Sequence, residues 1–173
     1  MFRKILSKIY DWTGALAAFF MVMTLIMILV SIAGRQFNFY LPGTDAYAGY
    51  CTAAVGFLAL AHTLRRGEHI RVTLILQRLP TDIKRWLEIV VYIIGSFLAG
   101  AFAFFSIRLM LMSREIGDIS TSNDATQLWI PQMGMALGAT VLAIAVFHGL
   151  VDVIAGRQPL DAISAKDEPA HIE

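Results

Sequence analysis

Hydrophobic residues run through the chain in four long stretches, and polar residues gather between them. The stretches cover about residues 12–34, 46–64, 87–112 and 128–151. A helix needs about 20 mostly apolar residues to cross the roughly 30 Å hydrocarbon layer of a bilayer, and each stretch reaches that length. The pattern therefore predicts an all-α membrane protein with four transmembrane helices.

The composition agrees with this prediction. Of the 173 residues, 57% are apolar and 16% charged, and the mean hydropathy is +0.65. These values are abnormal for a soluble globule. The first stretch follows basic residues, as a secretory signal does, but it is longer than a signal core of about 7 to 15 residues. We expect it to be kept as a span, within one domain over residues 1–156 that is followed by a cytoplasmic tail, 157–173.

The basic residues are distributed unevenly among the polar segments. Eleven of the 14 Lys and Arg residues precede the first stretch, lie between the second and third, or follow the fourth. Cytoplasmic segments of membrane proteins keep such residues, so both termini and the middle segment are predicted to be cytoplasmic. Arg35 and Asp45 then mark the opposite, periplasmic boundary of the first two spans.

The middle segment contains the most polar run near any span. In "RRGEHIRV" the five residues expected to fix a cytoplasmic boundary are Arg65, Arg66, Gly67, His69 and Arg71. The following "IRVTLILQRL", residues 70–79, is too short to cross a bilayer, and its periodicity does not distinguish helix from strand. Since a bare strand edge cannot face lipid, we expect a short segment lying along the membrane interface.

The centres of the predicted spans offer isolated hydroxyls and no ionisable group. Transport of an ion or proton normally requires such groups, or broken helices, near the midplane. By itself, therefore, the chain is predicted not to transport. Small residues recur instead at helix-packing spacing, at Gly95 with Ala99 and at Gly134 with Gly138. Such faces let helix backbones approach closely, either within this chain or against a partner.

Candidate chemistry is sparse. The single cysteine excludes a disulfide within the chain, the net charge of +1 argues against nucleic acid, and no hydrolase or phosphate-loop motif is present, so an enzyme is not expected. His62 and His148 should lie at similar depths near the cytoplasmic boundary. Two facing imidazoles could ligate haem iron, which leaves a haem-bearing anchor of a respiratory complex as an alternative. Interfacial histidines bonded to carbonyls or headgroups are the simpler interpretation, without a cofactor.

Three segments carry a family resemblance. "GRQFNFYLPG" (34–43), "LRRGEHIRVTLI" (64–75) and "LWIPQMGMALG" (128–138) resemble the small membrane subunit of tripartite ATP-independent periplasmic (TRAP) transporters. The resemblance covers about residues 10 to 155, and its most specific element is the Arg-x-Gly-x-His-Ile-x-Val pattern ending at Val72. Asp45 is one departure, since the family often has a glutamate at the start of the second span.

The resemblance implies a function that the residues alone do not. A small subunit of this family binds a larger membrane subunit, which carries the substrate and sodium sites, and works with a periplasmic substrate-binding protein that captures an organic acid anion. The chain would then be a non-conducting scaffold in the bacterial inner membrane, in contact with membrane lipids and supporting sodium-driven uptake by its partner.

Overall fold

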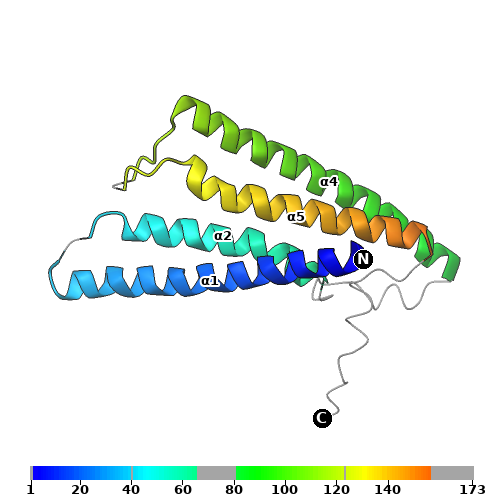
Figure 1. Ribbon diagram of the computed structural model, residues 1–173, viewed down its shortest axis with the longest axis horizontal. Helices are drawn as coiled ribbons and strands as arrows, with labels where there is room; N and C mark the ends of the chain where they lie inside the picture. The colour runs from blue at the N-terminus through cyan, green and yellow to red at the C-terminus, as the bar shows by residue number, and fades with distance from the viewer. Residues whose placement is uncertain (1, 40, 66–80, 123, 157–173) are drawn as a thin grey trace, which may run out of the picture.

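The computed structural model describes residues 2–39, 41–65, 81–122 and 124–156. Four long helices account for most of them: α1 (Phe2–Gln36), α2 (Thr44–Arg65), α4 (Thr81–Ile116) and α5 (Trp129–Ile154), all shown in Figure 1. All four are long and apolar enough to cross a membrane. The prediction of a four-helix, all-α membrane protein is thus confirmed. The interfacial segment and the tail predicted from the sequence lie outside the described residues.

The helices differ in length. α2 has 22 residues and α5 has 26, which at 1.5 Å per residue is close to the thickness of the hydrocarbon layer. α1 has 35 residues and α4 has 36, so each is about 50 Å long. A helix this long must tilt or extend beyond the hydrocarbon layer.

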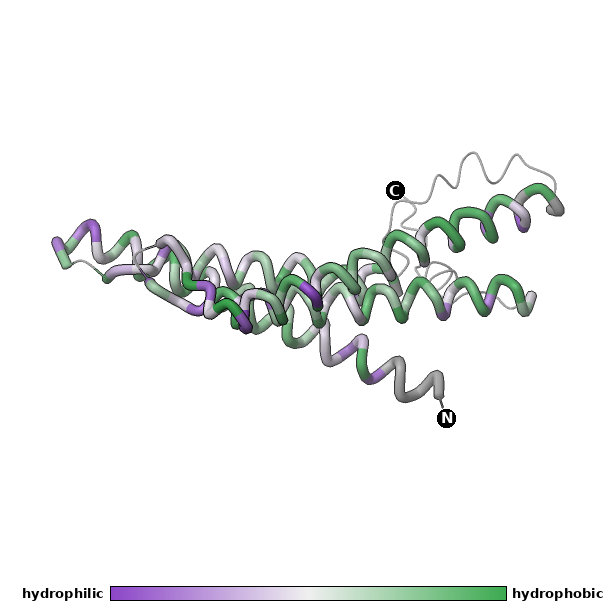
Figure 2. The backbone as a smooth tube through the Cα atoms, turned by 90° about the horizontal axis from the view of Figure 1, so that it is seen from above, coloured by the Kyte–Doolittle hydropathy of each residue, from purple (hydrophilic) through white to green (hydrophobic). Residues whose placement is uncertain are grey.

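The four helices lie side by side in the order α1, α2, α5, α4 (Figure 1). α1 packs on α2, α2 on α5, and α5 on α4, whereas the other pairs touch only marginally. Viewed from the edge, the helices overlap in a narrow band over much of their length and spread toward the N-terminal end of α1 (Figure 2). The fold is therefore close to a single layer, with α2 and α5 inside and α1 and α4 at the edges.

Small side chains form the buried contacts of this layer. The buried apolar residues include Ala17, Ala48, Ala54, Ala61, Ala99, Ala103, Ala136 and Ala139, and the only large side chain that is fully buried among the described residues is Leu58. In lipid, helices associate through close packing rather than through a hydrophobic driving force, and small residues allow that approach. Most large apolar side chains of α1 and α4 point outward instead.

The connections between helices follow local sequence signals. The turn between α1 and α2 contains Gly43, whose φ of +85° is a conformation that glycine adopts without steric cost. Pro131 lies in the first turn of α5, where a missing N–H leaves no hydrogen bond unmade. At the other end of α5, Gly156 has a φ of +69° and donates its N–H to the carbonyl of Val153, which closes the helix.

Candidate interaction surfaces

Hydroxyl groups in the middle of three of the spans are bonded within their own helices, whereas the buried Ser96 hydroxyl of α4 has no hydrogen-bond partner in the described chain. The hydroxyl of Thr24 donates to the carbonyl of Phe20 at 2.9 Å, and Thr52 and Thr140 bond in the same way to the carbonyls four residues before them, at 2.8 and 2.7 Å. These hydroxyls are therefore committed to their own helix backbones and do not point into a polar path. Formal charges lie toward the helix ends, and residues 12–34, 46–64, 89–107 and 129–151 carry none.

At the seam between α2 and α5, the backbones of the two helices come close together. A Cβ atom added to Gly138 would lie 2.5 Å from the carbonyl carbon and oxygen of Phe57, so these backbones leave no room for a side chain. One turn earlier, a Cβ added to Gly134 would lie 3.0 Å from that of Ala54. Gly134 and Gly138, two small residues noted in the sequence, therefore face α2 within this chain.

The outer seams also use glycine, but against side chains. A Cβ on Gly149 of α5 would lie 2.5 Å from the ring of Tyr92 on α4, and a Cβ on Gly14 of α1 would lie 2.7 Å from the ring of His62 on α2. Gly95 has looser surroundings, with Val146 at 3.4 Å. Ala99, its neighbour one turn along α4, is buried. The sequence pattern did not single out Gly14 or Gly149, because each is an isolated glycine whose ring partner lies on another helix.

Aromatic rings reach across the layer at its centre. Phe57 of α2 and Phe102 of α4 stack with their ring centroids 5.6 Å apart and their planes at 30°. This contact joins α2 to α4. It lies beside the close approach of Gly138 to the backbone of Phe57. The stacked rings therefore connect the two helical hairpins, α1–α2 and α4–α5.

The two charged residues predicted at one membrane boundary meet in the structure. The guanidinium of Arg35 donates to the Asp45 carboxylate at 3.0 Å, and the hydroxyl of Ser31 donates to its other oxygen at 2.7 Å. The two charged side chains are 76% and 73% exposed. An ion pair so exposed contributes little to stability. These contacts join the end of α1 to the first turn of α2.

A cluster of hydroxyl groups joins α2 to the loop between α4 and α5. Tyr50 donates to the Ser120 hydroxyl at 2.7 Å, and the hydroxyls of Tyr47 and Thr126 lie 3.1 Å apart. The sequence does not identify the partners of the two tyrosines, because the bonded residues are 70 and 79 positions apart.

Asp124 sits at the centre of this loop cluster. Its carboxylate oxygens are shielded from solvent, and no group in the described chain donates to them with good hydrogen-bond geometry. The nearby Thr126 hydroxyl, followed by those of Ser120 and Tyr50, still holds the pKa of Asp124 below its ordinary value. On the other side, a Cβ on Gly43 would lie 2.6 Å from that of Asp124, so the two interhelical loops are in contact.

The two histidines considered as haem ligands have different surroundings. Nδ1 of His62 lies 3.2 Å from the carbonyl oxygen of Tyr10 on α1, whereas Nδ1 of His148 lies 3.3 Å from the carboxylate of Asp152 in its own helix. Asp152 and Tyr10 are both buried. Each histidine therefore makes a polar contact of its own, and within the described part of the chain no three His, Cys, Asp or Glu residues could hold a metal ion.

The basic motif is only partly visible. Arg65 is the last residue of α2, whereas Arg66, Gly67, His69 and Arg71 lie outside the described residues. Its predicted role at the cytoplasmic boundary stays a prediction.

Large apolar side chains cover the outer helices. Those with more than half of their surface exposed include Phe19, Met21, Val22, Leu25 and Leu29 on α1, and Phe97, Leu98, Phe104 and Phe105 on α4. Apolar surface of this extent is not stable in water and requires lipid or a membrane partner. Because the fold is a single layer, both edges of it present such surface.

Comparison with known proteins identifies the family to which the chain belongs. The family model described as tripartite ATP-independent periplasmic transporters, DctQ component, matches residues 24–156. A comparison with curated proteins finds no significant match. The matched region begins within α1 and includes all of α2, α4 and α5 together with the loop cluster. It supports the interpretation as a transporter subunit over that as a haem-bearing respiratory anchor.

Proposed function

Because the chain belongs to the DctQ component family of TRAP transporters, we propose that it is a non-conducting scaffold for the larger membrane subunit of such a transporter. In this function the chain holds its partner at a fixed depth and orientation in the membrane while the partner moves substrate. The family is one of transporter components and not of enzymes, in agreement with the lack of hydrolase motifs in the sequence.

The lack of formal charges at the span centres is the observation that carries the scaffold role. Moving an anion through lipid requires polar or charged groups along its path. Here the hydroxyls of Thr24, Thr52 and Thr140 are bonded to their own helices, and the charges are confined toward the helix ends. The closely packed seam at Gly138 supports rigidity, because helices this close cannot slide without losing contacts.

The partners and orientation follow from the family and from the charge distribution. We propose that the chain lies in a bacterial inner membrane with both termini cytoplasmic, as the basic residues favour. The larger subunit would carry the sodium and substrate sites, and a periplasmic binding protein would deliver an organic acid anion. The Arg35–Asp45 end would then face the periplasm, and the motif at Arg65, Arg66, Gly67, His69 and Arg71 would fix the cytoplasmic boundary.

Reconstitution tests this division of labour. The chain and the large subunit encoded with it are placed in proteoliposomes, separately and together, with the binding protein added outside under an inward sodium gradient. We expect uptake of radiolabelled organic acid only when both membrane subunits are present. Uptake by this chain alone would refute the scaffold role, and full uptake by the large subunit alone would show that no scaffold is needed.

A further inference from the structure

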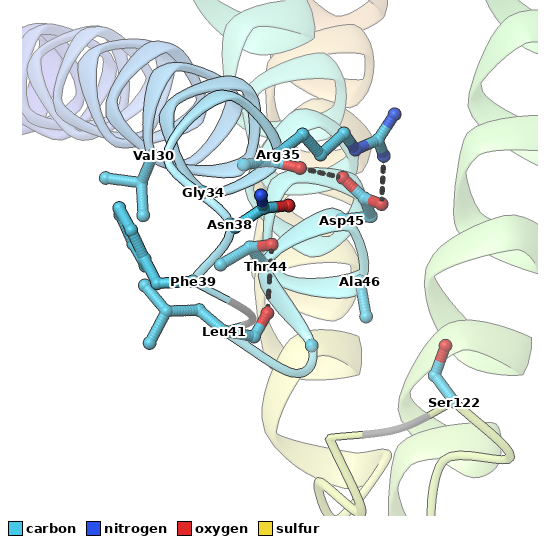
Figure 3. A pocket seen from close by; sticks show the side chains of 12 residues that line it. Val30, Gly34, Arg35, Asn38, Phe39, Leu41, Thr44, Asp45, Ala46 and Ser122 are labelled. Atoms are coloured by element: carbon cyan, nitrogen blue, oxygen red, sulfur yellow. Dashed lines mark hydrogen bonds and ion pairs between the residues drawn. The ribbon is translucent and has the colours of Figure 1, made fainter.

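A pocket opens at the end of the bundle where α1 turns into α2. It has a volume of about 390 Å³ and is lined by residues of α1, the turn, the start of α2 and the α4–α5 loop. Figure 3 shows Val30, Phe39 and Leu41 on one side of the pocket and the Arg35–Asp45 pair on the other. The proposed scaffold function does not use this pocket.

The lining changes from apolar to charged across the pocket. Val30 belongs to the apolar stretch of α1, and Phe39 and Leu41 extend that apolar wall into the turn. The opposite wall presents a cation, the Arg35 guanidinium, beside an anion, the Asp45 carboxylate, 3.0 Å apart. A pocket with an apolar wall and an opposite charged wall, at the end of a membrane span, matches the boundary between acyl chains and headgroups.

We propose that this pocket binds the headgroup of a zwitterionic phospholipid of the phosphatidylethanolamine type. The phosphate would take hydrogen bonds from the Arg35 guanidinium, whose planar donors suit phosphate oxygens. The ammonium would donate to the Asp45 carboxylate. The glycerol and upper acyl segments would lie along Val30, Phe39 and Leu41.

The Arg35–Asp45 ion pair favours a zwitterionic headgroup over an anionic one. An anionic headgroup such as phosphatidylglycerol gains the same contact with Arg35 but places its negative charge beside Asp45, with no ammonium to offset it. A zwitterion satisfies both residues at once. Since both side chains are about three-quarters exposed, each can turn toward a headgroup without first leaving a buried contact.

Native mass spectrometry of the full chain tests the assignment. The purified protein is titrated with phosphatidylethanolamine and phosphatidylglycerol of identical acyl chains, and the lipid retained is measured. We expect phosphatidylethanolamine to be retained about tenfold better, with that preference lost in Asp45→Asn. Arg35→Gln should weaken retention of both lipids. Equal retention of the two lipids by the unaltered chain would overturn the proposal.

Two further variants separate a pocket effect from misfolding. Arg108→Gln removes an exposed arginine of α4 that does not line the pocket, so lipid retention should be unchanged. Ala46→Leu leaves both charges in place but fills the pocket, so selective retention should fall while the helical circular dichroism stays the same. If Arg35→Gln and Arg108→Gln lose lipid equally, the effect is one of general charge and the site is refuted.

A soluble headgroup distinguishes a lipid from a free solute. If the apolar wall contributes to binding, glycerophosphoethanolamine, a soluble phosphodiester with the same charges as the headgroup, should leave the retained phosphatidylethanolamine in place when added at the concentration of the lipid. Displacement at equal concentration would assign the pocket to a soluble zwitterion and overturn the lipid assignment. This test does not involve transport, so its failure would leave the proposed scaffold function standing.

Discussion

The inner pair of helices, α2 and α5, and the outer pair, α1 and α4, differ in how they pack. α2 and α5 approach so closely that Gly138 has no space for a single added carbon, and the obstacle is the backbone at Phe57. At the outer seams the corresponding obstacles are the rings of His62 and Tyr92, which can turn. Of the most apolar part of each helix, 6% is buried in α1 and 17% in α4, against 22% in both α2 and α5. The inner pair thus packs backbone against backbone, and the outer pair supplies surface to the membrane or to a partner.

This difference explains how so flat a protein can be stable. A single layer buries little surface, and apolar burial itself is worth little in lipid, where the surroundings are as apolar as the side chains. The stabilising contacts must then come from close packing at a few points. We expect substitutions at the α2–α5 seam to cost most, and the same substitutions on outward faces to cost least.

Gly138→Leu should have the largest effect. The new side chain would meet the Phe57 backbone, which cannot move away without separating α2 from α5. Overpacking in a tight core typically costs about 1 to 3 kcal/mol, and a backbone obstacle places this variant at or above about 3 kcal/mol. Thermal unfolding in detergent, followed by tryptophan fluorescence and size-exclusion elution, measures the loss.

Two glycines with open surroundings serve as controls for this substitution. A Cβ on Gly56 of α2 or on Gly100 of α4 would meet nothing within 4 Å. Leucine at either position should leave stability unchanged or raise it, since leucine favours helix more than glycine does. If Gly138→Leu behaves like Gly100→Leu, the α2–α5 seam is not what holds the layer together.

Leu58→Ala should come next, because Leu58 is 1% exposed and packs with Ala17 and Ala54 between α1 and α2. Removing a buried leucine leaves a cavity, and we expect a loss of about 2 kcal/mol, the low end of the range for soluble cores, since lipid provides no hydrophobic term. Leu98→Ala is the matched control, as Leu98 is 61% exposed. Comparable midpoints for the two variants would contradict the inner–outer distinction.

Gly14→Ala should cost less, about 1 kcal/mol, because its obstacle is a side chain that can shift. The added methyl would collide with the His62 ring, 2.7 Å away, and displace it from the Tyr10 carbonyl. A double-mutant cycle checks the cause. With His62→Ala in the background, Gly14→Ala should become nearly neutral. A cost that stays the same in that background would show that the glycine acts through something other than the histidine.

Much of this architecture could be predicted from the sequence, and the reason is specific to membranes. A chain in lipid must satisfy its backbone hydrogen bonds internally, so long apolar stretches become helices and the charges that interrupt them mark the ends. This identified the four helices and the Arg35 and Asp45 positions. Gly134 and Gly138 could be recognised as packing residues from their spacing, but not which helix they would meet.

The remaining contacts join residues that are far apart in the sequence, and no local sequence pattern predicts them. Tyr50 and Ser120 are hydrogen-bonded although they are 70 residues apart. In the sequence, Asp124 is only a charged residue before the last apolar stretch. The order of the helices in the layer decides these contacts, and periodicity within one helix does not encode that order. Likewise, the sequence predicts similar depths in the membrane for His62 and His148. In the structure each of them contacts a different polar group.

Asp124→Asn should have the smallest effect and a distinctive dependence on pH. The hydroxyls around Asp124 lower its pKa, so folding favours the ionised carboxylate. The resulting stabilisation is fully present above the ordinary pKa of aspartate and is lost as the pH falls through the lower, folded-state value. The thermal midpoints of the two proteins should therefore differ most near pH 7 and converge in acid, where the native carboxyl is neutral like the amide.

The pH profile, and not the size of the difference, tests the role of this loop cluster. Measuring both proteins at a series of pH values separates a charge effect from a shape effect. A difference that persists unchanged in acid would mean that Asp124 acts by shape against Gly43 and not by charge. Because the α2–α5 seam is intact in this variant, its midpoint should stay well above that of Gly138→Leu at every pH. If it did not, the two hairpins would be held together at their loops and not along the inner helices.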